Sequence, residues 1–95
     1  MYRAEIIPSV AEVLRHLPPD LKRAVKSSIR AVGADPAIGE PLRGELKGHF
    51  KVGVRRYRIV YRIDRKARAV VVVAVGHRRS VYEELADLQR QGAKP

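Results

Sequence analysis

The residues of this chain whose types suit chemistry are cationic, and they concentrate between residues 47 and 82. Arginine and lysine alternate with apolar residues through FKVGVRRYRIVYRI and return as the pair Arg78–Arg79, shortly before Tyr82. A guanidinium group can bind two phosphate oxygens at once, and a tyrosine ring can stack on a base or orient a hydroxyl group. The pattern predicts a site for phosphate or nucleic acid, built on strands and on the elbow that follows them.

The overall charge favours the same class of partner. Lysine and arginine number 20 against 10 acidic residues, which gives a net charge of +10. Such an excess indicates nucleic acid, an anionic surface or an acidic protein as partner, although a solvated basic surface without a partner would have the same composition. The chain has no cysteine, and no two of its histidines stand at ligand spacing, so we expect neither a metal site nor a cofactor.

The cationic residues must be positioned by a small sheet. Residues 50–55 and 57–63 alternate apolar with polar side chains, and residues 69–76 are almost entirely valine, as expected of a central strand covered on both faces. The short polar segment DRKAR between the last two runs predicts an antiparallel hairpin. Tyr57 and Tyr61 fall on the apolar side, so we expect both in the core.

The remaining segments predict a scaffold of helices. Residues 2–7 read as a strand ended by Pro8, and Ser9 is a candidate N-cap for a helix that stops at the next proline pair. A second helix should extend to Val32 with Gly33 as its C-cap, followed by a loop over residues 34–48. Ser80 begins a capping box for a short final helix.

These elements define an α+β fold class with one domain over residues 1–95. The expected order is an N-terminal strand, a helix hairpin, a three-stranded antiparallel run forming one small sheet, and a short C-terminal helix. The start of the sequence lacks the apolar region of a signal peptide, and the longest apolar run is too short to cross a bilayer. We therefore expect a cytoplasmic protein with no membrane partner.

If the strands pair as they run, the cations gather on or beside one sheet face. The helix that follows Ser80 would add backbone N–H groups and a favourable dipole for an anion. The candidate residues are Lys47, Lys51, Arg55, Arg58, Arg62, Arg78, Arg79 and Tyr82. His77, beside the elbow, is expected to have a structural or supporting role, and His16 and His49 are expected at the surface.

The pattern PLRG…FKVGVRRYRIVYRI…VVVVAVGHRRSVYEEL resembles the RelE/ParE toxin superfamily, and particularly its RelE-like messenger-RNA endonucleases (mRNA interferases). The Y-R-I-V-Y strand and the G-H-R-x-x-V-Y elbow are the most specific parts of this resemblance, which extends over nearly the whole chain. It implies RNA cleavage without a metal, on the ribosome, by attack of a ribose 2′-hydroxyl group on the adjacent phosphate. It also implies an acidic antitoxin that wraps the toxin or displaces its C-terminal helix.

The resemblance assigns catalytic roles to four residues. Lys51 and Tyr82 would orient or deprotonate the 2′-hydroxyl group, Arg58 would stabilise the pentavalent phosphorane, and Arg78 would stabilise charge or protonate the 5′-leaving oxygen. The chain departs from the pattern at Gly53, where a family enzyme has another lysine. Lys47 and Arg55 are the candidate substitutes for that charge.

Two other functions fit the same sequence. A ParE-like toxin of this fold would bind and poison DNA gyrase, although such relatives generally lack the full set of catalytic-type residues present here. A catalytically weak member that only binds RNA or its protein partner is the third reading, which the departure at Gly53 keeps open.

Overall fold

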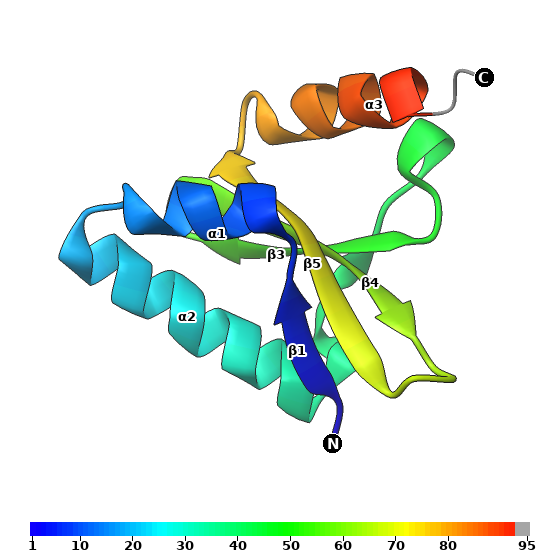
Figure 1. Cartoon of the computed structure of the whole chain (residues 1–95), viewed down its shortest axis with the longest axis horizontal. Coiled ribbons are helices and arrows are strands. Elements are labelled where there is room, and N and C mark those ends of the chain that lie inside the picture. Colours follow the sequence, from blue (N-terminus) through cyan, green and yellow to red (C-terminus); the bar gives the residue numbers. More distant parts are fainter. Residues whose placement is uncertain (93–95) are drawn as a thin grey trace.

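The structure, a computed structural model, describes residues 1–92 and has the predicted α+β fold. A five-stranded sheet in the order β1-β5-β4-β3-β2 separates α1 and α2 from α3 (Figure 1). Strand β1 is parallel to β5, and the other neighbours are antiparallel. The elements are β1 (Arg3–Ile6), α1 (Pro8–Arg15), α2 (Pro19–Ala34), β2 (Glu40–Pro41), β3 (His49–Val54), β4 (Tyr57–Asp64), β5 (Ala69–His77) and α3 (Val81–Gly92).

Three predicted details of the first half are wrong. Helix α1 begins at Pro8, so Ser9 lies inside it and is not the N-cap; proline suits the first helical position because its N–H group is absent. Gly33 is also inside its helix, where a methyl group would lie 3.1 Å from the carbonyl oxygen of Tyr2. The expected loop over residues 34–48 contains the short strand β2 and two 3₁₀ turns, Pro36–Ile38 and Gly44–Leu46.

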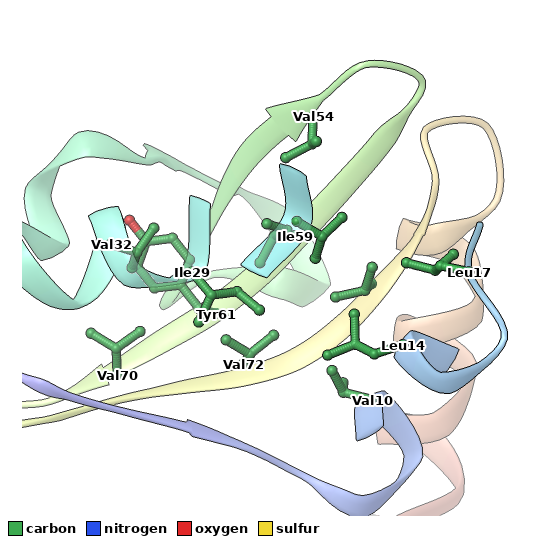
Figure 2. Packing of buried hydrophobic residues seen from close by; sticks show 12 residues of the cluster. Val10, Leu14, Leu17, Ile29, Val32, Val54, Ile59, Tyr61, Val70 and Val72 are labelled. Atoms are coloured by element: carbon green, nitrogen blue, oxygen red, sulfur yellow. The ribbon is translucent and has the colours of Figure 1, made fainter. Parts of the chain in front are cut away.

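The main hydrophobic core fills the space between the sheet and the helices α1 and α2 (Figure 2). Ile59, Tyr61 and Val72 of the central strands are fully buried, together with Val10 and Val32 of the helices. Tyr57 is half-buried at the edge of the same cluster, so the prediction that both tyrosines belong to the core is confirmed. This packing fixes which face of β4 is left for polar side chains.

Helix α3 packs on the opposite face of the sheet through a second apolar cluster. Val60 is fully buried there against Val81, Leu85 and Ala86 of α3, with Leu46 beside them. We expected this side of the strands to be the cationic one, and the structure covers its centre with α3. Alternation along β4 places Val60 between Arg58 and Arg62, and an apolar side chain at that point gives α3 a surface to cover.

The Tyr61 hydroxyl group ties the loop before β2 to the core. It donates a hydrogen bond to the Pro36 carbonyl oxygen at 2.7 Å and accepts one from the Gly39 N–H group at 3.0 Å. Burial of the phenol raises its pKa, which keeps the hydroxyl group protonated and able to donate. A methyl group at residue 39 would lie 2.3 Å from the hydroxyl oxygen, so only glycine fits there.

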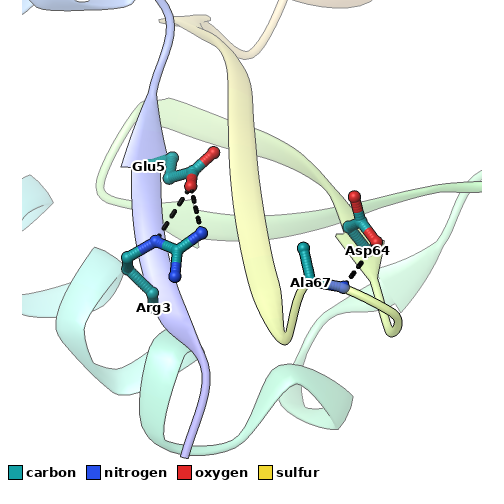
Figure 3. Close-up of polar contacts among 4 residues, drawn as sticks. All are labelled: Arg3, Glu5, Asp64 and Ala67. Carbon is teal, nitrogen blue, oxygen red and sulfur yellow. Dashed lines mark hydrogen bonds and ion pairs between the residues drawn. The ribbon is translucent and has the colours of Figure 1, made fainter.

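The β4–β5 hairpin is confirmed as antiparallel, and side-chain and backbone contacts close its turn (Figure 3). The Asp64 carboxylate accepts a hydrogen bond from the Ala67 N–H group at 3.0 Å. The Arg68 carbonyl oxygen accepts one from the Arg3 N–H group at 2.9 Å, which ties β1 to this end of the sheet.

No helix within residues 1–92 combines the length and apolar character needed to cross a membrane.

We predict that Gly39→Ala lowers the free energy of unfolding by about 1–3 kcal/mol, because the buried Tyr61 ring cannot move away from the new methyl group. Tyr61→Phe should cost about 1–2 kcal/mol, because it leaves the Pro36 and Gly39 backbone groups without their partner. Urea unfolding of the single and double variants measures both effects, with Gly92→Ala, which meets open space, as the control. A Gly39→Ala cost that is the same with tyrosine or phenylalanine at residue 61 would contradict this account.

Candidate functional site

The register of the sheet places the predicted cations on one face. In the β3–β4 pair, Lys51 stands opposite Val60, and Gly53 stands opposite Arg58. Residues directly opposite each other in an antiparallel pair point to the same side, so Lys51 and Arg58 share the face that α3 partly covers. Gly53 is exposed and both cations are half-buried, which leaves this part of the sheet open to a polymer.

Lys51 and Tyr82 are brought together across the sheet and α3. The Lys51 ammonium nitrogen lies 5.8 Å from the centre of the Tyr82 ring. The Tyr82 ring in turn packs against the apolar cluster beneath α3, so its position is set by the helix start. The contact is of the cation–π type. It holds an ammonium group beside a phenol where the start of α3 meets the exposed part of the sheet face.

The Arg58 side chain folds back over Gly53. Its Nη1 atom donates hydrogen bonds to the carbonyl oxygens of Tyr57 at 2.8 Å and Arg55 at 3.1 Å. A methyl group at residue 53 would lie only 3.2 Å from this nitrogen and 3.3 Å from the guanidinium carbon. The guanidinium group therefore occupies the space that a side chain at residue 53 would use.

The elbow after β5 is joined to the β3–β4 turn by its backbone. The Arg78 N–H group donates to the Arg56 carbonyl oxygen at 2.8 Å, and the Ser80 N–H group donates to the His77 carbonyl oxygen at 3.0 Å. The side chains of Arg78 and Arg79 are exposed at this corner. The elbow thus presents two guanidinium groups beside the turn that holds Arg58.

His77 shapes the elbow from the opposite face of the sheet. Its Nδ1 atom accepts a hydrogen bond from the Arg79 N–H group at 3.2 Å. In the register His77 stands opposite Tyr57, a core residue, and the two rings meet edge-on with centres 6.1 Å apart. It points away from Lys51 and Arg58, which fits the structural role expected for it.

Three of the predicted phosphate-binding residues lie apart from this group. Arg55 is in the β3–β4 turn with a φ of 55°, so it does not belong to the sheet face. Arg62 pairs with His49, whose Nε2 atom contacts the Gln89 side chain near the end of α3 at 3.2 Å. Arg62 and the exposed Lys47 therefore lie toward the far end of α3, and the helix divides the predicted cationic face.

The cations at the elbow end form no ion pair among the residues that the structure describes. Within residues 1–92, no carboxylate lies within 4.0 Å of the cationic groups of Lys51, Arg58 or Arg78. Glu83 and Glu84 are exposed in the first turn of α3, where the helix dipole favours them. The described part of the chain contains no group of three residues suited to hold a metal ion.

Arg56 was missed in the sequence, although its carbonyl oxygen anchors the elbow. The signal was present, because β3 and β4 are separated by only Arg55 and Arg56, and a two-residue turn places its carbonyl groups at the sheet end. The antiparallel pairing expected for β4 and β5 already placed the elbow near this corner, and the hydrogen bond from Arg78 to Arg56 is what the structure adds.

Comparison with known proteins identifies the fold. Residues 8–82 match the family described as "ParE toxin of type II toxin-antitoxin system, parDE". The chain is 34% identical over 83 residues to toxin RelG of Mycobacterium tuberculosis, covering 85% of this chain and 95% of the relative. It is also similar to a crystal structure of the RelBE2 toxin–antitoxin complex of that organism, with 34% identity, a TM-score of 0.75, and coverage of 81% of this chain and 98% of the other.

A second solved structure covers more of the chain. The isolated RelE toxin of E. coli superposes with a TM-score of 0.73 at 26% identity, over 96% of this chain and 99% of the toxin. The matched family and these relatives agree with the resemblance carried by the strand and the elbow. The chain belongs to the RelE/ParE superfamily and is a toxin of the type II toxin–antitoxin class.

Proposed function

We propose that this toxin is an endoribonuclease that cleaves messenger RNA on the ribosome, in the cytoplasm, without a metal or cofactor. The observation that carries the proposal is the arrangement at the elbow end of the sheet. Lys51 lies beside Tyr82, and Arg58 and Arg78 are both bound to the β3–β4 turn. These are the four residues to which the RelE-like resemblance assigns the reaction.

In the proposed reaction, a ribose 2′-oxygen attacks the adjacent phosphorus. Lys51 and Tyr82 orient the 2′-hydroxyl group and take up its proton, and their contact at 5.8 Å allows both to face one nucleotide. As the new O–P bond forms, the bond from phosphorus to the 5′-oxygen breaks. The products are a 2′,3′-cyclic phosphate and a 5′-hydroxyl group, and Arg78 stabilises or protonates the leaving oxygen.

Negative charge on the phosphorane oxygens is the main demand of this reaction. Preorganised donors at such a site typically lower the barrier by several kcal/mol, and the loss of one donor costs about 10²–10³ in rate. Arg58 suits this role because two backbone carbonyl oxygens fix one of its nitrogens and the rest of the fork remains for phosphate. Within residues 1–92 no carboxylate lies within 4.0 Å of this guanidinium group, so no ion pair competes with phosphate for it.

The proposal also accounts for Gly53. Because the Arg58 guanidinium group lies over Gly53, it supplies positive charge where the resemblance expects a lysine. Lys47 is a poor substitute for the missing lysine because it lies just before β3, near the C-terminal end of α3. Arg55 is a poor substitute because it lies in the β3–β4 turn. We therefore propose that Arg58 can take this position only because residue 53 is a glycine.

We further propose that an antitoxin neutralises the toxin. RelBE2 of M. tuberculosis and RelBE of E. coli were each solved as a toxin–antitoxin complex, and the present chain is similar to both. A net charge of +10 favours an acidic partner.

Gyrase poisoning is the alternative activity, and the matched family bears the ParE name. Both activities would stop growth, so growth arrest alone does not separate them. We predict that induced expression shortens messenger RNA at codon-phased positions and leaves the DNA-damage response uninduced. Arg78→Ala and Tyr82→Phe should each lower cleavage about 10²–10³-fold while the protein stays folded.

Arg65→Ala, an exposed arginine of the β4–β5 turn, is the control and should cleave like the wild type. Sequencing of RNA ends after induction measures cleavage, and a damage-responsive reporter measures gyrase poisoning. Induction of the reporter with intact messenger RNA would contradict the proposed function and favour the gyrase alternative.

We predict opposite effects of Gly53→Ala on stability and on cleavage. Alanine in a strand is about 0.5–1 kcal/mol more favourable than glycine, so unfolding should not become easier. Its methyl group would displace the Arg58 guanidinium group, and the maximal cleavage rate should fall by about tenfold or more. Single-turnover cleavage with urea unfolding checks both, and an unchanged rate would show that the position of Arg58 over Gly53 is unimportant.

A further inference from the structure

A hollow lies on the other side of the β3–β4 turn, away from Lys51. Its volume is about 430 Å³, within the range that accommodates small ligands. It opens between the α1–α2 connection and the turn, and it has no part in the reaction proposed above. The residues that line it are Pro18, Asp20, Leu21, Arg55, Arg56 and Tyr57.

The lining combines an apolar wall with two guanidinium groups. Tyr57 and Leu21 are half-buried and pack on the main core, so the wall they form is fixed. Arg55 and Arg56 are exposed, and within residues 1–92 neither has a carboxylate within 4.0 Å. The acidic residue of the lining, Asp20, is paired with Arg23. An aromatic wall beside free arginines is the chemistry that binds a base and its phosphate in single-stranded nucleic acid.

The hollow and the proposed cleavage site share one piece of backbone. The Arg56 carbonyl oxygen binds the Arg78 N–H group at 2.8 Å, and the Arg55 and Tyr57 carbonyl oxygens bind the Arg58 side chain at 3.1 and 2.8 Å. A strand of RNA at Arg58 and Arg78 therefore needs to pass only around this turn to reach the hollow. This continuity favours RNA as the occupant over an acidic protein segment.

We infer that the hollow binds a nucleotide that flanks the scissile phosphate. Its base lies against Tyr57 and Leu21, and Arg55 and Arg56 hold its phosphate. The inference rests on the proposed function, because it adds a binding position to the same RNA. It makes Arg56 a determinant of how much RNA the toxin grips beyond the cleaved bond.

The test measures the affinity of the toxin for 2′-O-methyl RNA, which cannot undergo the 2′-hydroxyl attack. The oligonucleotide is lengthened by one nucleotide at a time at either end. For the wild type we expect a step of about tenfold when the added nucleotide reaches the hollow. Arg56→Glu should abolish this step and leave the shorter oligonucleotides bound as tightly as in the control. Arg65→Glu, the same charge change in the exposed β4–β5 turn, is that control and should keep the step.

A second measurement locates the base directly. Oligonucleotides with 5-iodouridine at the added position should cross-link to Tyr57 on irradiation, as identified by mass spectrometry of the digested protein. Equal steps in Arg56→Glu and Arg65→Glu, or cross-links only to residues outside the hollow, would overturn the inference while RNA binding itself remained.

Two other outcomes are distinguishable. A polyglutamate peptide can be added as a competitor of RNA binding. If Arg56→Glu weakens this competition but keeps the affinity step for the added nucleotide, the hollow binds an acidic protein segment and the inference is wrong. If the wild type binds none of the oligonucleotides and cleaves no RNA, the proposed function fails together with it.

Discussion

The three carbonyl groups of Arg55, Arg56 and Tyr57 hold the cationic end of this toxin together. Two of them accept hydrogen bonds from the Arg58 side chain, and the third accepts one from the backbone of Arg78. Their direction depends on Arg55, which adopts a left-handed φ of 55° in a two-residue turn. A single backbone segment therefore fixes the Arg58 guanidinium group and the backbone from which the Arg78 side chain extends.

The sheet supports this corner by using its two faces differently. One face is fully apolar over Ile59 and Tyr61 and is sealed by α1 and α2. On the other face, Val60 of β4 with Val73 and Ala74 of β5 forms the apolar surface on which α3 packs, and the start of that helix carries Tyr82 to Lys51. The same contact that covers part of the cationic face thus completes the proposed site, because burial of apolar area fixes the helix start more firmly than exposed ion pairs do.

Much of this was predictable from residues 50–82. Alternation along β3 and β4 indicated correctly that Lys51 and Arg58 share a face, and the valine run indicated the central strand. The covering of Val60 by α3 was not predictable, because a single valine between two arginines does not form a hydrophobic pattern that would indicate a buried face. The space over Gly53 depends on the rotamer of Arg58, which a sequence does not specify, and β2 is too short to leave a pattern.

On the proposed function, Lys51, Arg58, Arg78 and Tyr82 cleave RNA through the ribose 2′-oxygen. The most direct measurement is the chemistry of the new ends after purified toxin cuts messenger RNA on translating ribosomes. We expect a 2′,3′-cyclic phosphate or its 3′-phosphate hydrolysis product on one fragment and a 5′-hydroxyl group on the other. A 5′-phosphate with a free 3′-hydroxyl group would overturn the proposed reaction, because those ends require water, and not the neighbouring ribose, as the nucleophile.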